Sequence, residues 1–288
     1  MAQHPDVKGF FDPATHTVTY LVSDPATRMA AIIDPVLDYD PASARTSTRS
    51  IDTVMAALHE AGLTLALVLE THAHADHLTA ADHLREAEGV SIGIGAHITE
   101  VQSAFAPLFG ATDVTTDGAV FDHLYAHGDT FALGDMTVEV IHTPGHTPAC
   151  VSYRIGDAVF TGDTLFMPDY GTARTDFPGG DARTLYRSIH TLLALPDDTR
   201  LFVGHDYLPA GRTDYRFETT VAAQRDHNIH VGGGVSEEAF VAMRETRDAT
   251  LGAPQLILPS LQINIRAGAL PPPDAAGDTW LRLPLNAI

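Results

Sequence analysis

The order of hydrophobic and polar residues predicts short strands and helices that alternate along the chain. Two runs rich in β-branched side chains, 16–24 and 28–35, predict two strands joined by a turn. Residues 51–62 carry apolar side chains at the spacing of a helix. The continuous apolar run 63–72 is too short for most helices, and it predicts a strand buried on both faces. A further helix is expected over residues 75–89.

The same alternation continues from residue 90 onward. Further strands are predicted at residues 90–95, 137–143, 149–155, 158–163 and 200–206. Asp181 and Ser236 are N-cap candidates, and each begins a helical pattern, at 181–195 and 236–251. The prolines at 271–273 predict an extended tail.

This organisation predicts an α/β sandwich in which residues 1–235 form the main domain. Residues 236–288 are expected to add a C-terminal helix and an extended tail packed on the same domain. The three glycines at 232–234 indicate a hinge before that helix, and the polar stretch 38–50 predicts a loop.

Composition narrows the classes of function. No run of 18 apolar residues exists, which argues against a membrane-spanning helix, and the first residues resemble no targeting segment, so we expect a cytoplasmic protein. The net charge of −20 argues against nucleic acid as a partner. The single cysteine, Cys150, excludes a disulfide framework within the chain, and its apolar surroundings predict a buried thiol.

The stretch ETHAHADHLTAAD, residues 70–82, gathers side chains that bind metals. His72 and His74 are two residues apart, so an extended backbone directs both to the same side. Asp76 and His77 follow at the entrance of the expected helix. The C-terminal end of a buried strand is where α/β proteins place ligands, and imidazoles with a carboxylate suit zinc, iron or manganese.

Three later segments end in the same way. HTPGHT places His146 after a turn, TGDTLF places Asp163 at a strand end, and VGHDY does the same for His205. Four predicted strand ends therefore each supply a metal-type ligand. The sequence predicts a metal centre where these ends meet.

The motifs T-H-x-H-x-D-H, G-H-T, G-D-T and G-H-D resemble the metallo-β-lactamase superfamily in order and spacing. The resemblance implies a four-layer αβ/βα sandwich with the metals at one edge. The superfamily scheme would place His72, His74 and His146 at one metal, Asp76, His77 and His205 at a second, and Asp163 between the two.

Three stretches, 71–81, 171–190 and 261–273, are further similar to the persulfide dioxygenases, and more closely to their bacterial β-lactamase-like hydrolase branch. That similarity implies one Fe(II) per chain, held by His72, His146 and Asp163, and oxidation of glutathione persulfide by O2 to sulfite and glutathione. The remaining residues of the motifs would then orient the ligands: His74, Asp76, His77 and His205.

A site of two imidazoles and one carboxylate leaves three positions open, enough for a substrate sulfur and O2 together.

Many of the persulfide dioxygenases carry a cysteine in the segment 171–176, where this chain has none. The oligomeric state is left open by the sequence, a homodimer included.

Two other functions stay open at this stage. A glyoxalase II-like thioester hydrolase would use two metals to generate a hydroxide, and every ligand for a second metal is present. The stretches similar to persulfide dioxygenases favour the oxygenase instead. The other function is a non-enzymatic sulfur or metal carrier. A sulfur relay needs an exposed reactive thiol, and Cys150 in an apparent strand is a poor candidate.

An anionic tripeptide needs local positive charge on so acidic a chain, and an arginine can meet a carboxylate with two hydrogen bonds. We therefore predict that Arg174 and Arg266 hold the substrate's carboxylates, helped by Tyr207 and Asn264. Asn264 and Arg266 are two apart in a segment expected to be extended, which would aim both to one side. Similarity to the persulfide dioxygenases assigns the same positions to glutathione. The alternative is that Arg174 pairs with Asp176 or Asp169 as a structural link at the surface.

Overall fold

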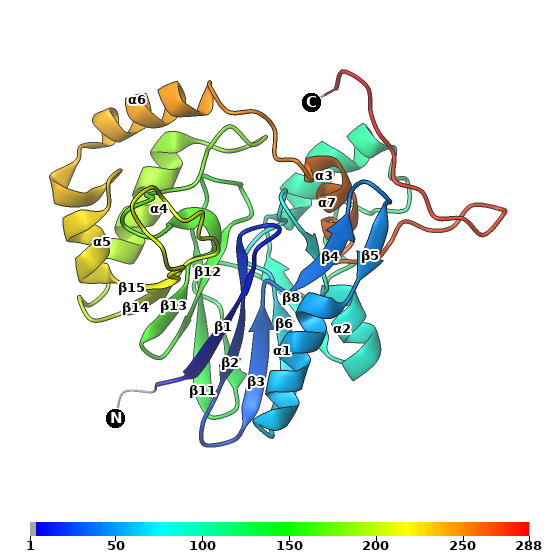
Figure 1. Ribbon diagram of the computed structural model, residues 1–288, viewed down its shortest axis with the longest axis horizontal. Helices are drawn as coiled ribbons and strands as arrows, with labels where there is room; N and C mark the ends of the chain where they lie inside the picture. The colour runs from blue at the N-terminus through cyan, green and yellow to red at the C-terminus, as the bar shows by residue number, and fades with distance from the viewer. Residues whose placement is uncertain (1–3, 288) are drawn as a thin grey trace.

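The computed structural model describes residues 4–287 and consists of two β-sheets that face each other between two layers of helices (Figure 1). The first sheet has the strand order β1 (Asp6–Asp12), β2 (Thr17–Ser23), β3 (Met29–Ile33), β6 (Thr64–Leu69), β8 (Ser91–Gly95) and β9 (His123–Tyr125). The second has the order β10 (Thr130–Leu133), β11 (Met136–His142), β12 (Val151–Ile155), β13 (Ala158–Phe160), β14 (Arg200–Phe202) and β15 (Glu218–Thr220).

Helices cover the outer face of each sheet. On the first sheet lie α1 (Arg49–Glu60), α2 (Ala81–Glu88), α3 (Ile98–Phe109) and α7 (Ile257–Asn264). On the second lie α4 (Ala182–Leu193), α5 (Val221–His227) and α6 (Glu237–Asp248). Two short 3-10 turns, η1 (Gly162–Thr164) and η2 (Gly232–Gly234), complete the main body.

Three separate apolar cores hold these layers together. Side chains such as Val18, Leu69 and Val140 fill the space between the sheets. The outer face of the first sheet packs on its helices, and Val159 and Leu201 of the second sheet pack on α4 and its neighbours. Alternate residues of the central strands therefore enter two different cores, which explains their continuous apolar sequences. The predicted four-layer αβ/βα sandwich is confirmed.

Several predicted elements are confirmed with small shifts of their ends. The side chain of Asp181 accepts a hydrogen bond from the Thr184 amide, and that of Ser236 accepts one from the Ala239 amide, so both predicted N-caps are present. The helix expected over 75–89 begins only at Ala81, because a short strand, β7 (Leu78–Thr79), precedes it.

Two predictions about local structure are wrong. The polar stretch 38–50 is not a loop, because it contributes to a hairpin of β4 (Val36–Asp40) and β5 (Arg45–Ser47) that pairs with β7 in a small third sheet. The segment around Asn264 is not extended, because α7 runs to that residue. Helix α7 is buried on most of its surface, so it has no polar face to show the helical period.

The C-terminal part of the chain contacts both halves of the sandwich. Helix α6 packs on α4, where the rings of Tyr186 and Phe240 lie 5.6 Å apart, and Leu261 of α7 enters the core of the first sheet. Residues 271–287 form no helix or strand and project from the body near α3 and α7 (Figure 1). Within residues 4–287, no helix has the length and apolar character needed to cross a membrane.

Candidate metal centre

The predicted ligands lie on loops that leave the ends of strands in both sheets. His72 follows β6 of the first sheet, whereas His146 follows β11 of the second. Asp163 lies in η1 directly after β13, and His205 follows β14. Gly162 has a positive φ of 47°, and a Cβ there would lie 2.5 Å from the Thr71 hydroxyl. A glycine at 162 thus lets the two sheets approach closely enough for their ligands to meet.

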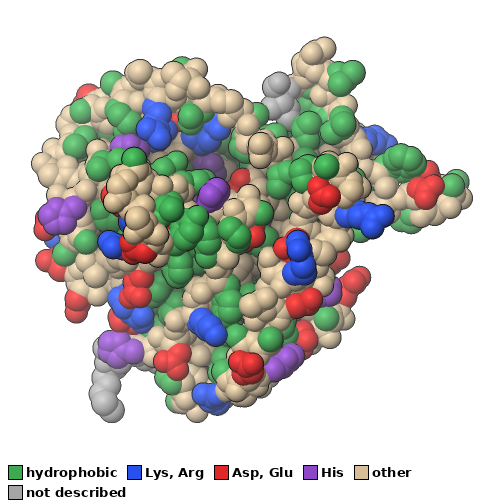
Figure 2. All heavy atoms as spheres, viewed as in Figure 1, with side chains coloured by type: hydrophobic (Ala, Val, Ile, Leu, Met, Phe, Trp, Pro, Cys, Tyr) green, Lys and Arg blue, Asp and Glu red, His purple; other side chains and the backbone are tan. Residues whose placement is uncertain are grey.

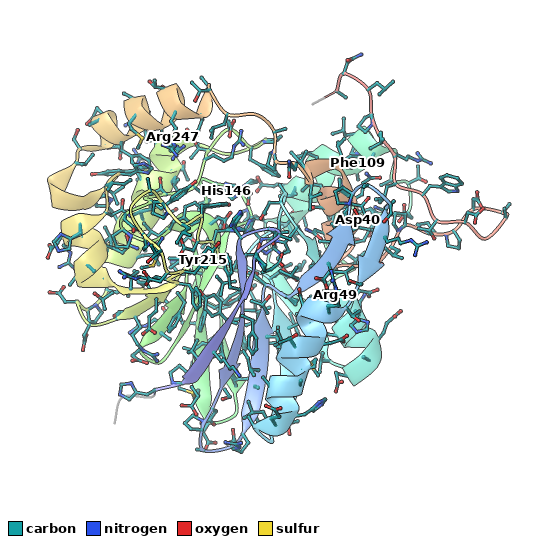
Figure 3. All side chains as sticks on the ribbon, in the orientation of Figure 1. Asp40, Arg49, Phe109, His146, Tyr215 and Arg247 are labelled. Carbon is teal, nitrogen blue, oxygen red and sulfur yellow. The ribbon has the colours of Figure 1, made fainter. Side chains whose placement is uncertain are left out.

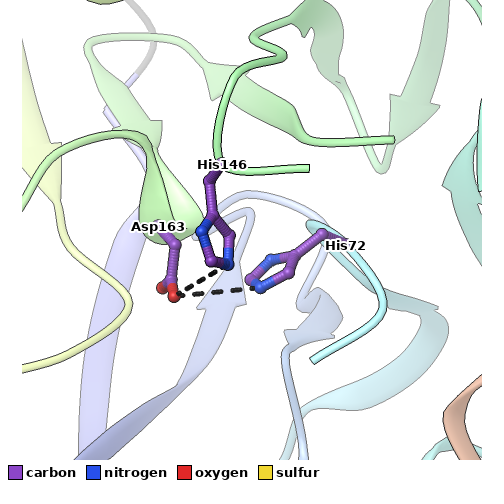
Figure 4. Close-up of side chains that lie close together, drawn as sticks. All are labelled: His72, His146 and Asp163. Atoms are coloured by element: carbon purple, nitrogen blue, oxygen red, sulfur yellow. Dashed lines mark ion pairs between the residues drawn. The ribbon is translucent and has the colours of Figure 1, made fainter. Parts of the chain in front are cut away.

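His72, His146 and Asp163 form a compact cluster (Figure 4). Asp163 Oδ2 lies 3.8 Å from His72 Nε2 and 3.7 Å from His146 Nε2. His72 Nε2 and Asp163 Oδ1 are buried and have no hydrogen-bond partner among the described residues. Unsatisfied buried groups of this kind are costly without a cation between them. The donor set therefore fits a metal ion.

The opposite nitrogen of each imidazole is already engaged. His146 Nδ1 lies 2.8 Å from the carbonyl oxygen of Arg174, and His72 Nδ1 lies 3.0 Å from the hydroxyl of Thr71. These contacts fix the ring orientations and leave both Nε2 atoms free to bind a metal.

His74 faces two buried acids. Its Nε2 lies 3.1 Å from Asp34 Oδ1 and 3.4 Å from Glu70 Oε2. Burial alone would lower the pKa of His74, but the carboxylate of Asp34 and that of Glu70 raise it well above its ordinary value. Burial also raises the pKa of Glu70 to about 7. Asp34 in turn accepts hydrogen bonds from the Thr71 amide, at 2.7 Å, and its hydroxyl, at 2.8 Å.

The other motif residues surround the cluster. His205 Nε2 lies 3.3 Å from Asp76 Oδ2 and 3.3 Å from Asp163 Oδ1. His77 Nδ1 lies 3.7 Å from Asp76 and 3.3 Å from the Thr17 hydroxyl. His74, Asp76 and His77 also approach one another closely enough to hold a cation. The geometry therefore leaves room for one metal or for two.

A cavity of about 670 Å³ opens onto this centre. His146, Asp76 and Asp163 form part of its wall, and Phe166 and Tyr207 add aromatic surface. In Figure 3, His146 lies near the middle of the molecule, and Asp40 and Arg49 lie on the side of the β4–β5 hairpin. The space-filling view shows a hollow near the middle of this face, between the two halves (Figure 2).

Two of the four predicted substrate-binding residues line this cavity, Arg174 and Tyr207. The ring of Tyr207 stacks on His205 with centroids 5.3 Å apart, and burial raises the pKa of its hydroxyl well above the usual value. Arg174 donates to both carboxylate oxygens of Asp176, at 2.5 and 2.6 Å, and to the Gly252 carbonyl, at 2.8 Å. This pairing is the structural link that the sequence left as the alternative.

The other two predicted residues, Asn264 and Arg266, are not among those that line the cavity. The Asn264 amide donates to the carbonyls of His74 and His77, both at 2.8 Å. Arg266 is 7% exposed and donates to the two carboxylate oxygens of Asp113, at 2.7 and 2.8 Å. The argument from an extended segment is wrong, and both side chains have protein partners.

Sequence reasoning missed the role of Asp34 and the position of Glu70. Asp34 follows β3 directly, so an acid at the end of a buried strand was the available signal. Cys150 is buried as predicted, and burial raises the pKa of its thiol to about 12. That thiol is a poor sulfur carrier because thiolate is the reactive form.

Comparison with known proteins gives one matching family model, the metallo-beta-lactamase superfamily, over residues 13–205. A probable metallo-hydrolase of Burkholderia pseudomallei is 52% identical over 98% of this chain and 99% of its own length. Glyoxylase B2 of Dictyostelium discoideum is 44% identical over 100% of this chain and 99% of its own. The human mitochondrial persulfide dioxygenase ETHE1 is 33% identical over 92% of this chain and 90% of its own.

Among solved structures, that of ETHE1 from Myxococcus xanthus superposes with a TM-score of 0.74. It is 34% identical in sequence and covers 92% of this chain and 100% of its own. The relatives are thus named for more than one activity.

Proposed function

This chain belongs to the metallo-beta-lactamase superfamily, and we propose that within it the protein is a persulfide dioxygenase that binds one Fe(II). The reaction converts glutathione persulfide, O2 and one water into glutathione and sulfite, with release of two protons. The outer sulfur is oxidised and O2 is reduced, so no further reductant is needed.

The observation that carries this proposal is the direction in which the imidazole of His74 faces. His72, His146 and Asp163 form one three-ligand cluster, whereas His74 Nε2 faces the carboxylates of Asp34, at 3.1 Å, and Glu70, at 3.4 Å, although its ring lies 4.0 Å from that of His72. A dinuclear hydrolase of this superfamily would need His74 to turn a nitrogen toward the first metal together with His72. Two imidazoles and one carboxylate are instead the ligand set of non-haem iron oxygenases, which keep open positions for substrate and O2.

Iron bound by His72, His146 and Asp163 would supply the coordination positions at which a persulfide sulfur and O2 meet, and the electrons for O2 would come from that sulfur. The chain supplies the surroundings. His72 and His146 are held in place by Thr71 and by the Arg174 carbonyl, which preorganises the ligand set. Phe166 and Tyr207 line the approach to Asp163, and their rings reduce the access of water to the reacting sulfur.

The test joins metal analysis to turnover. Purified active protein should hold about one iron per chain, consume O2 with glutathione persulfide and release sulfite. His146→Ala should lose the metal, because a three-ligand site that loses one ligand holds it poorly. His83→Ala, which changes an exposed histidine of α2, is the matched control. Two zinc ions in active protein, with no uptake of O2, would contradict the proposal.

A glyoxalase II-like thioester hydrolase is the second candidate, and two observations favour it. Asp76 and His205 lie 3.3 Å apart beside Asp163, where a second metal would sit, and one relative is named a glyoxylase. Asp76→Ala separates the two functions. The dioxygenase should keep its iron and lose about 10- to 100-fold in turnover, whereas the hydrolase should lose one of two metal equivalents.

A further inference from the structure

The walls of the cavity contain three arginines, Arg45, Arg49 and Arg174, among five aspartates, Asp12, Asp38, Asp40, Asp76 and Asp163. An acidic chain of net charge −20 repels anions over most of its surface, so positive charge at this cavity decides whether an anionic peptide can enter. Free guanidinium groups are the ones that can bind a ligand, and the three arginines differ in this respect.

Arg174 has little capacity left for a ligand. Its guanidinium donates three hydrogen bonds, two to Asp176 and one to the Gly252 carbonyl. The charge of Arg174 is also balanced by Asp176, which lies in the same loop. A substrate carboxylate would have to displace that aspartate before it could bind there.

Arg45 and Arg49 are free by comparison. Arg45 lies opposite Asp40 in the hairpin, and its charge helps to lower the pKa of that carboxyl, but within residues 4–287 its guanidinium makes no hydrogen bond and no ion pair within 4.0 Å. Arg49 is 84% exposed and lies 3.9 Å from Asp38, the limit of an ion pair, which contributes little at a surface. Unlike Arg174, neither guanidinium is held to its neighbouring aspartate by a hydrogen bond, so both can turn to a ligand in the cavity.

The segment between these arginines adds hydroxyl groups to the same wall. Thr46 and Ser47 line the cavity, and neither hydroxyl has a hydrogen-bond partner in residues 4–287. Strand β5, Arg45–Ser47, is the edge of its three-stranded sheet, so no further strand covers it. Two arginines and two hydroxyls of residues 45–49 thus line the same cavity as the candidate metal ligands His146 and Asp163.

We propose that the β4–β5 hairpin and the start of α1 recognise the carboxylates of an anionic thiol peptide, through Arg45 and Arg49. The assignment rests on the proposed function for the identity of that peptide, glutathione persulfide. It replaces Arg174 and Arg266, whose guanidinium groups are held by aspartates. Arginine suits the task because its planar fork binds a carboxylate with two parallel hydrogen bonds.

The test uses the iron-loaded protein and the double variant Arg45→Gln/Arg49→Gln. KM for glutathione persulfide should rise about 10- to 100-fold, the loss expected for hydrogen bonds to a charged group, while kcat stays within about threefold. The persulfide of glutathione diethyl ester lacks the carboxylates. Wild type should discriminate strongly against that ester, and the double variant should lose most of this discrimination.

Arg247→Gln, which changes an exposed arginine of α6 outside the cavity, should leave KM and discrimination unchanged. Calorimetry with glutathione itself tests the hairpin assignment separately from the dioxygenase function, because it needs no turnover. Weaker binding in the double variant supports the hairpin assignment even if O2 uptake is absent. An unchanged ratio between acid and ester in the double variant would overturn it, even in a confirmed dioxygenase.

Discussion

At the residue scale, His74 is the position at which the mononuclear and dinuclear hypotheses differ most. It lies in a metal-binding motif, yet its Nε2 faces Asp34 and Glu70, which are both buried. The motif alone could not reveal this, because Asp34 is 40 residues away in sequence and arrives through the pairing of β3 with β6.

We expect His74→Ala to keep most of the iron and to lower stability. Removing the imidazole leaves two buried carboxylates facing each other, and breaking a buried ion pair typically costs about 3–5 kcal/mol. Elemental analysis and urea denaturation measure the two effects. His72→Ala is the comparison, and it should lose iron. Loss of iron in His74→Ala with unchanged stability would place His74 among the ligands.

Arg266 gives a second prediction at this scale. Its bidentate pair with Asp113 lowers the pKa of that carboxyl, and only 7% of Arg266 is exposed. Arg266→Ala should therefore reduce the free energy of unfolding by about 1–3 kcal/mol and leave KM for glutathione persulfide unchanged. A raised KM with unchanged stability would restore the sequence-based assignment to the substrate.

The candidate ligands could be named from the sequence because each follows a strand whose apolar pattern is clear. His146 and Asp163 come after strands that enter the central core, so their placement at one edge followed from the fold. Asn264 and Arg266 were misplaced because α7 is apolar on most sides and has no helical period. Their true partners are distant in sequence, and no local pattern encodes them.

At the element scale, helix α6 holds in place the loop that contains Arg174 and Thr175, next to the metal centre. Arg244 is 1% exposed and donates to Asp248 Oδ1 at 2.5 Å. Asp248 also accepts from the Thr175 amide at 2.8 Å, next to Arg174, whose carbonyl contacts His146. The loop that orients one ligand is therefore fixed by a buried ion pair of the C-terminal helix.

Asp248→Asn should weaken iron binding although the residue contacts no ligand. The neutral amide leaves Arg244 without its charge partner and loosens the loop, and losses of outer contacts typically reduce metal affinity about 10- to 100-fold. Competition with a chelator measures the affinity. Glu245→Gln, on the exposed side of α6, is the control and should bind iron like wild type. Equal affinities would mean that the loop holds its place without α6.

The hairpin of β4 and β5 escaped sequence analysis for a physical reason. Its residues are polar and partly exposed, and Pro41 and Ser43 suggest an irregular loop. The strands form because β4 pairs with β7, which follows the metal motif directly. Strand pairing supplied by a distant segment cannot be read from the polar sequence itself.

At the scale of the whole molecule, the metal joins the two halves of the sandwich. His72 belongs to the half built on the first sheet, whereas His146 and Asp163 belong to the other. A ligand that binds only the folded state stabilises it, by about 2.7 kcal/mol when its concentration is one hundred times its dissociation constant. Removal of the metal should therefore lower the unfolding temperature.

Differential scanning calorimetry with and without a chelator measures this effect. The unfolding temperature of wild type should fall on chelation, whereas that of His72→Ala should not respond, because the metal is already absent. A wild-type transition that is unchanged after the metal is shown to be gone would mean that the sheets hold together without it.

The single cysteine has a consequence for how the whole molecule would tolerate a persulfide substrate. Cys150 is 2% exposed, and its pKa of about 12 leaves a thiolate fraction on the order of one in 100,000 at neutral pH. Sulfur exchange requires a thiolate that can be reached. A persulfide that entered the cavity would therefore find no reactive thiol of this chain to which its outer sulfur could pass. Such a catalyst would offer the substrate no reactive thiol to modify, and it would need no thiol reductant to restore it between turnovers.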